Sequence, residues 1–251
     1  MSLEGKVAVI TGAAMGIGQA SAVRLAQDGA DIAILDNNEA GLQETKGLVE
    51  AEGRNCVALP TDLLDRTAVK EAFAQIRKET GPVGILHNNV GQSGREKAKS
   101  AFEDSDPAQW DFIQNINVRV AADCAREVIR GMKEAGFGRI VNTSSSTAYR
   151  GGVGLTDYAT SKSAILGLTR SLALELAPHK ITVNAVCPGT VATRALQDIP
   201  KETLQPVIDQ IPMKTICEPE DVAHVVSFFA SPGAWYVTGT HLMVNGGRVL
   251  L

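Results

Sequence analysis

No run of lysine or arginine occurs in this chain, whose 24 basic and 28 acidic residues give a net charge of -4. Phosphate backbones require a positive stripe, so nucleic acid is not an expected partner. No stretch approaches the ~20 apolar residues that span a bilayer. The N-terminal segment MSLEGKVAVITG also lacks the basic region and long apolar region of a secretory signal. We therefore expect a soluble cytoplasmic protein without a membrane partner.

Cysteine is scarce as well. Cys56, Cys124, Cys187 and Cys217 lie far apart, with neither C-x-x-C spacing nor a local histidine, so we expect free thiols and no metal site. The chain also lacks a linker rich in Pro, Ser or Gly, a break in composition and an internal repeat. Residues 1–251 are therefore expected to form one domain.

Short aliphatic runs recur along the chain and predict the strands of a sheet. They are VAVI (7–10), IAIL (32–35), CVAL (56–59), ILHN (85–88), IVNT (140–143), ITVNAV (181–186) and HLMVN (241–245). Apolar runs without alternation suit strands that are buried on both faces, and most of them are separated by segments of helical period. The pattern predicts an α/β fold: a single-domain, doubly wound parallel sheet of about seven strands with helices on both faces.

Two segments depart from this pattern and follow strand ends, where ligands bind in open α/β sheets. Residues 92–106 are polar and loop-like, and residues 190–216 mix short helical patches with three prolines. The second segment is amphipathic, so it either closes over an apolar substrate as a lid or packs on the core. Its apolar residues are Leu196, Ile199, Leu204, Val207, Ile208, Ile211 and Met213.

Three glycines stand where a phosphate group could bind. Gly12, Gly16 and Gly18 follow the first predicted strand and open a helix. Without a Cβ, the backbone N–H groups of this turn can approach a pyrophosphate at the positive end of the helix dipole. The spacing G-x-x-x-G-x-G is looser than the dinucleotide fingerprint, and a merely tight turn is the alternative.

Asp36 ends the second predicted strand, about 20 residues after the glycines, where a carboxylate can accept hydrogen bonds from an adenosine ribose. The same charge would repel a 2'-phosphate, and neither Met15 nor Asn37 supplies a compensating cation. NAD is therefore favoured over NADP. A solvated aspartate is the plain alternative, and S-adenosylmethionine would suit these residues equally well.

Further motifs narrow the choice. They are TGAAMGIG (11–18), NNVG (88–91), a serine at 145, YATSK (158–162), CPGTVAT (187–193) and NGG (245–247). In this order and spacing, over nearly the whole length, the chain resembles the short-chain dehydrogenase/reductase family. The resemblance implies a Rossmann-like dinucleotide-binding fold, an oxidoreductase activity and a homotetramer, or a homodimer.

The chemistry of one motif can be argued from the residues themselves. Tyr158 and Lys162 are four positions apart and share a helix face, so the ammonium can lie ~4–5 Å from the phenol oxygen. At an effective dielectric constant near 20, that separation favours the phenolate by ~3–4 kcal/mol. The pKa of Tyr158 would then fall toward neutrality, which suits a general acid/base. An exposed surface pair is the alternative.

The resemblance assigns the remaining catalytic residues. It gives Ser145, thirteen residues before Tyr158, the hydroxyl that polarises the substrate oxygen. It gives Asn117 the support of a water-linked proton path to Lys162, with Asn115 as the competing choice. His87, His179, His224 and His241 have no partner at catalytic spacing, so structural roles are expected for them.

The resemblance also implies a set of residues that border the cofactor. They are Gly12, Met15, Gly16, Ile17, Gly18, Asp36, Asp62, Leu63, Asn89, Val90, Gly91, Tyr158, Lys162, Pro188, Gly189, Val191 and Thr193. Taken alone, Asp62 would be a helix N-cap. Val90 replaces the family's usual alanine and makes the cofactor wall bulkier, and Asn245 replaces the usual aspartate before the final glycine pair.

Our first functional hypothesis is an NAD(H)-dependent oxidoreductase that interconverts a secondary alcohol and a ketone, with a small molecule as its partner. Reduction of a 3-oxoacyl thioester is the second substrate class. Two further alternatives are a non-catalytic nucleotide sensor or scaffold on the same fold, and a methyltransferase on a similar sheet. The set of Tyr158, Lys162 and Ser145 argues against these last two.

Overall fold

A seven-stranded parallel sheet forms the middle layer of the protein, whose computed structural model describes residues 2–94, 101–193 and 201–250. The strand order is β3-β2-β1-β4-β5-β6-β7. The strands are β1 (Val7–Thr11), β2 (Asp31–Asp36), β3 (Cys56–Pro60), β4 (Val83–Asn88), β5 (Gly138–Thr143), β6 (Ile181–Pro188) and β7 (His241–Val244). Each coincides with one of the seven aliphatic runs, so the predicted fold class is confirmed.

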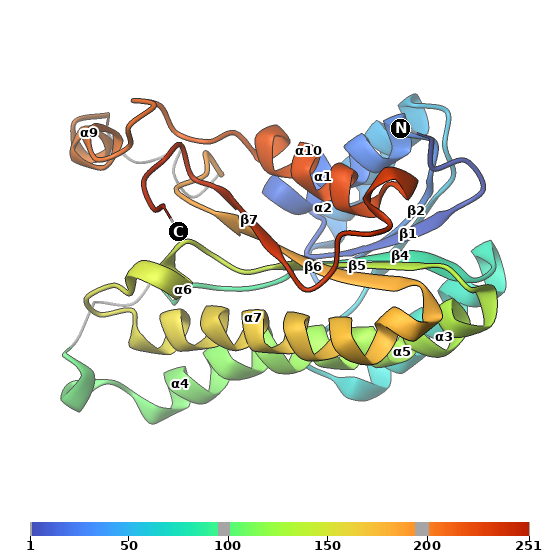
Figure 1. Ribbon diagram of the computed structural model, residues 1–251, viewed down its shortest axis with the longest axis horizontal. Helices are drawn as coiled ribbons and strands as arrows, with labels where there is room; N and C mark the ends of the chain where they lie inside the picture. The colour runs from blue at the N-terminus through green and yellow to red at the C-terminus, as the bar shows by residue number, and fades with distance from the viewer. Residues whose placement is uncertain (1, 95–100, 194–200, 251) are drawn as a thin grey trace.

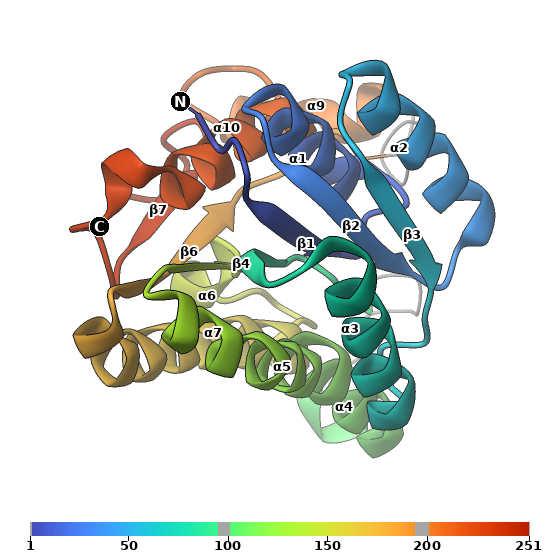
Figure 2. The same cartoon turned by 90° about the vertical axis from the view of Figure 1, so that its right-hand side faces the viewer.

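Helices cover both faces of the sheet (Figures 1 and 2). One face carries α1 (Gly16–Gln27), α2 (Glu39–Ala51) and α10 (Pro219–Ala230). The other carries α3 (Arg66–Thr80), α4 (Pro107–Gln114), α5 (Val120–Ala135) and α7 (Thr156–Leu176). Two shorter helices, α6 (Thr147–Arg150) and α9 (Lys201–Asp209), lie beyond the ends of β5 and β6 in the chain. None of the described helices has the length and apolar character needed to cross a bilayer.

The core has two layers because successive side chains of a strand point to opposite faces. In β4, Ile85 packs in the cluster under α1 and α10, and Leu86 packs in the cluster under α3 and α5. All six residues of β4 are buried, which explains the continuous aliphatic runs of the central strands. The strand order reverses between β1 and β4, so the carboxyl ends of these two strands border the crevice where doubly wound sheets bind ligands.

The predicted lid segment contains α9, while Leu196 and Ile199 lie outside the described residues. Ile211 is buried, whereas the side chain of Met213 is 71% exposed. Asn245 precedes the glycine pair against which this segment packs, and its Oδ1 accepts from Gly247 N (2.9 Å) while its Nδ2 donates to Val249 O (3.0 Å). An aspartate could form only the first of these bonds, so asparagine closes this turn more fully.

Candidate active site

The glycine turn brings α1 against the ends of β1 and β4. A Cβ on Gly12 would lie 2.8 Å from Val90 Cα, and a Cβ on Gly18 would overlap Gly12 O, so both positions require glycine. Gly16 begins α1 with φ +57. Within the described residues the N-cap, Met15, forms no side-chain cap, and the first turn of α1 holds no acid. The N–H groups at this helix end therefore fit an anion such as a pyrophosphate.

Asp36 is fixed beside that turn. Its Oδ2 accepts from Ala14 N (3.1 Å) and its Oδ1 accepts from Asn38 N (3.0 Å). The carboxylate is half-buried at the end of β2. Since each carboxylate oxygen has a second lone pair, Asp36 can still accept from ribose hydroxyls.

Two other predicted cofactor residues follow β3. Asp62 is exposed, and its Oδ1 accepts from Leu64 N (2.9 Å) in a local turn. The N-cap of α3 is Asp65, whose Oδ1 accepts from Thr67 N (2.8 Å), so the N-cap interpretation of Asp62 is wrong. The Leu63 side chain is buried in the core, which leaves only its backbone for a cofactor contact.

Asn89 and Val90 are braced against β1. Asn89 Nδ2 donates to Thr11 O (3.1 Å) and Gly12 O (3.0 Å). The backbone N–H groups of Asn89 and Val90 both donate to Thr11 Oγ1, at 3.0 and 3.1 Å. These hydrogen bonds fix Asn89 and Val90, which are predicted to border the adenosine, against the glycine turn.

The end of β6 and the residues after it connect the serines that follow β5 with the glycine turn. Pro188 O accepts from Ser146 N (2.9 Å), and Gly189 N donates to Val244 O (2.8 Å). Val191 pairs with Cys217 in a parallel bridge. Thr193 Cγ2 would lie 3.4 Å from a Cβ on Gly16, so this threonine packs over the start of α1, which also includes the predicted contact Ile17.

Tyr158 and Lys162 lie in the first two turns of α7, with Lys162 Nζ 5.8 Å from the centre of the Tyr158 ring. The lysine side chain is buried, and Nζ donates to Thr143 O at 2.9 Å. Burial lowers the pKa of Lys162 to about 8. The Cys187 thiol acts in the opposite direction and raises this pKa, but burial is the larger cause.

The serine and asparagine that the resemblance assigns to catalysis lie near this pair. Ser145 is buried and its Oγ accepts from Thr147 N (3.1 Å), while Ser144 Oγ donates to Lys162 O (2.7 Å). Asn117 lies in a π-helical turn, η2 (Asn115–Arg119), and its Oδ1 accepts from Gln92 N (2.9 Å). Such a turn inserts one residue and re-aims the side chains that follow.

Gly91 separates Asn117 from the lysine. A Cβ on Gly91 would lie 2.5 Å from Asn117 Oδ1 and 3.0 Å from Lys162 Nζ, so only glycine leaves both polar atoms in place. Asn115 Oδ1 instead accepts from Arg119 Nε (2.9 Å). Of the two asparagines considered from the sequence, the geometry therefore brings Asn117 to the lysine.

Sequence reasoning missed the carbonyl of Thr143 and the backbone of Gln92, which hold Lys162 and Asn117. Both are main-chain groups, so no side-chain pattern could have indicated them.

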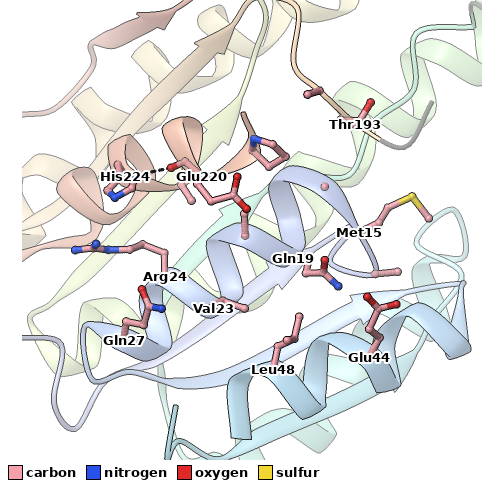
Figure 3. A pocket seen from close by; sticks show the side chains of 16 residues that line it. Met15, Gln19, Val23, Arg24, Gln27, Glu44, Leu48, Thr193, Glu220 and His224 are labelled. Atoms are coloured by element: carbon pink, nitrogen blue, oxygen red, sulfur yellow. Dashed lines mark hydrogen bonds between the residues drawn. The ribbon is translucent and has the colours of Figure 1, made fainter. Parts of the chain in front are cut away.

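A cavity of about 440 Å³ lies elsewhere, along the outer side of α1 between α2 and α10 (Figure 3). Met15 and Thr193 line one end of it, and Arg24, Gln27 and His224 line the other. It meets the candidate site only around the glycine turn, and neither Tyr158 nor Lys162 lines it. The predicted catalytic pair therefore lies outside this cavity.

Comparisons with known proteins agree with the fold and the motifs. A family model described as enoyl-(acyl carrier protein) reductase matches residues 12–248. The chain is 36% identical over 250 residues to the 3-oxoacyl-[acyl-carrier-protein] reductase FabG of Pseudomonas aeruginosa, with 100% of both proteins covered. It is 36% identical to the acetoacetyl-CoA reductase of Rhizobium meliloti, covering 97% of this chain and 98% of that protein. The crystal structure of NAD+-bound xylitol dehydrogenase has a TM-score of 0.92 at 31% identity, covering 98% of this chain and 100% of that one.

Proposed function

Because the chain belongs to the short-chain dehydrogenase/reductase family, we propose that it is an NAD(H)-dependent oxidoreductase that interconverts a secondary alcohol and a ketone. The observation that carries the proposal is the pairing of Tyr158 with a buried lysine, whose Nζ lies 5.8 Å from the tyrosine ring centre. A positive charge held so near a phenol favours the phenolate, because both lie in a medium less polar than water.

Different residues of this chain have different roles in proton transfer. In alcohol oxidation the Tyr158 oxygen takes the hydroxyl proton, and in ketone reduction it returns one to the carbonyl oxygen. Ser145 holds the substrate oxygen through its hydroxyl, and Lys162 keeps the phenol acidic. Asn117 and the carbonyl of Thr143 fix the surroundings of the ammonium. A bound nicotinamide dinucleotide supplies the hydride acceptor or donor.

NAD(H) is the proposed cofactor because of Asp36. Its carboxylate is half-buried next to the glycine turn, where it would repel a ribose 2'-phosphate. The residues at 15 and 37 are Met and Asn, so neither supplies a cation to offset that repulsion. The NAD+-bound xylitol dehydrogenase, which shares this fold at 31% identity, supports the same choice.

The second candidate activity is reduction of a 3-oxoacyl thioester. Two of the compared relatives carry the names of reductases for 3-oxoacyl-[acyl-carrier-protein] and acetoacetyl-CoA. In either case we propose that residues 190–216 act as the lid of the substrate site within one domain, 1–251. The half-buried Leu204, Val207 and Ile208 of α9 give that lid an apolar side.

The test is an absorbance assay of the reduced nicotinamide. The purified protein is mixed with NAD+ or NADP+ and a panel of secondary alcohols, and with NADH or NADPH and ketones or acetoacetyl-CoA. We expect turnover with the NAD pair, and the better substrate class decides between the two candidates. Turnover only with the NADP pair would refute the Asp36 argument.

The variant Tyr158→Phe tests the assignment of the base. General acid/base groups contribute roughly 100- to 10,000-fold, so turnover should fall by that factor while dinucleotide binding, followed by calorimetry, is retained. Tyr236→Phe, which removes a hydroxyl that the proton-transfer scheme does not use, is the matched control. Undiminished turnover in Tyr158→Phe would refute the assignment, and dinucleotide binding by a wild type without any turnover would favour the non-catalytic alternative.

A further inference from the structure

His87 is a buried imidazole in the middle of an otherwise aliphatic layer. It lies in β4 with 0% of its surface exposed, and its register partners in β1 and β5 are Ile10 and Val141. Burying an imidazole there costs free energy unless it is hydrogen-bonded. The proton-transfer scheme above does not use this residue, so its presence calls for another explanation.

The imidazole has one hydrogen-bond partner in the part of the chain that the structure describes. His87 Nε2 lies 3.0 Å from Thr143 Oγ1, and Nδ1 has no hydrogen-bond partner among the described residues. Burial lowers the pKa of His87 to about 3, so the ring is neutral near neutral pH. Either neutral tautomer forms the bond to Thr143, because a hydroxyl both donates and accepts.

Thr143 is the residue that anchors the lysine. Its carbonyl oxygen accepts from Lys162 Nζ at 2.9 Å, and this carbonyl belongs to the last residue of β5. The pairing of β4 with β5 ends one residue earlier, at Asn88 and Asn142. The hydrogen bond between the His87 side chain and the Thr143 hydroxyl therefore links β4 to β5 one residue beyond the last β5 residue that is paired with β4.

The other side of His87 connects to β1. Its backbone oxygen accepts from Thr11 Oγ1 in a long bond of 3.5 Å, and the same Oγ1 receives the N–H groups of Asn89 and Val90. Polar contacts of His87 thus join the ends of β1, β4 and β5, through the imidazole on the β5 side and through the backbone oxygen on the β1 side. These are the strand ends that carry the cofactor turn and the lysine anchor.

We propose that His87 is a positioning residue of the catalytic site, which fixes the Thr143 carbonyl and through it the Lys162 ammonium beside Tyr158. The inference rests on the proposed function for its kinetic consequences. The geometric part, that the imidazole holds the lysine anchor, is independent of which substrate is turned over.

Replacing the imidazole should loosen the anchor without unfolding the sheet. His87→Val puts a β-branched aliphatic side chain into a central strand and leaves the Thr143 hydroxyl unpaired. The loss of one hydrogen bond predicts a fall in kcat of roughly fivefold, with KM changed less. His87→Gln, whose amide can again bond to Thr143, should recover most of the activity.

The decisive readout is the titration of Lys162 itself, followed by NMR of its side chain and assigned with Lys162→Met. Tyr158 on α7 and Cys187 on β6 are the titratable groups that face the ammonium, beside the polar Asn117 and the Thr143 carbonyl. With a less firmly held acceptor, the Lys162 midpoint in His87→Val should fall by roughly half a pH unit below that of the wild type. Thr143→Val should lower it similarly, and the double variant should be no worse than either single one.

Thr182→Val is the control, because this buried threonine of β6 pairs in register with Arg139 near the opposite end of the strands. It should leave kcat and the Lys162 titration unchanged. An unchanged titration in His87→Val and Thr143→Val would overturn the proposal, as would additive losses in the double variant. Because the titration needs no substrate, failure of the proposed function would show separately, as absence of turnover in a wild type whose Lys162 still responds to His87.

Discussion

Lys162 is a single residue of the candidate site whose buried charge lowers the stability of the protein. The residue is 3% exposed, and burial lowers the pKa of its ammonium from 10.5 to about 8. Between these two values the unfolded chain binds more protons than the folded one, so this lysine makes the protein more stable as pH rises. Below about pH 8 the whole cost of burying the charge, roughly 3 kcal/mol, is present.

Lys162→Met should therefore stabilise the protein while abolishing its chemistry. At neutral pH we expect the free energy of unfolding to rise by roughly 1–3 kcal/mol, since the cost of the buried charge disappears and one hydrogen bond to Thr143 is lost. The difference from wild type should shrink as pH increases from about 8 toward 10.5. Urea unfolding at several pH values measures it, with exposed Lys70→Met as control. A variant less stable than wild type at every pH would contradict this view of the lysine.

Single residues also show how much of the candidate site could be predicted from the sequence. The spacing of Tyr158, Lys162 and Ser145 is written in side-chain types, so the candidate catalytic residues could be named before any coordinates. The N-cap interpretation fell on Asp62 and missed Asp65, because both aspartates precede the same helix and only the backbone geometry selects Asp65. The role of Thr143 rests on its carbonyl, which every residue type has.

At the scale of elements, Arg248 links the start of the predicted lid segment (190–216) to the residue that follows α9. Its Nη1 donates to Thr190 Oγ1 (3.2 Å) and its Nη2 to Gln210 Oε1 (2.6 Å). Gly247 packs beside Pro212, where a Cβ would lie 3.3 Å from the proline ring. The amphipathic pattern of 190–216 left lid and core packing equally open, because a half-buried helix such as α9 has the same pattern in both cases.

Arg248→Met should loosen the lid without touching the catalytic pair. Losing both hydrogen bonds frees the start of the segment and the residue that follows α9, so we expect KM to rise and kcat/KM to fall by roughly tenfold. Steady-state kinetics with the best substrate from the panel measure this change. Arg130→Met, on the exposed side of α5, should have wild-type values. A fall in kcat with KM unchanged would show that the segment does not act as a lid.

At the scale of the molecule, the position of the site follows from the strand order. The chain passes from β1 outward to β3 and returns to β4, so the ends of β1 and β4 border a crevice that no crossover covers. The sequence predicted a doubly wound sheet with ligand-binding segments at strand ends, because its glycine, asparagine and serine motifs each follow a buried aliphatic run. It did not predict the strand order. The sequence also could not predict that the Thr143 carbonyl binds Lys162, since the position of Thr143 depends on where the pairing of β4 with β5 ends.

The edge of the sheet at β7 points to an assembly of several chains. Large apolar side chains near it remain exposed in the single chain: Phe228 at 36%, Trp235 at 64%, Tyr236 at 84%, Leu242 at 41% and Leu250 at 85%. Monomeric proteins rarely expose so many in one stretch of chain, because covering them gains roughly 25 cal/mol per Å². We predict a homotetramer, or a homodimer, by light scattering at micromolar concentration. Tyr236→Glu should shift the mass toward smaller species, because burying a carboxylate in such a contact is costly, whereas Leu48→Glu on α2 should not. A wild type with the mass of one chain would refute the prediction.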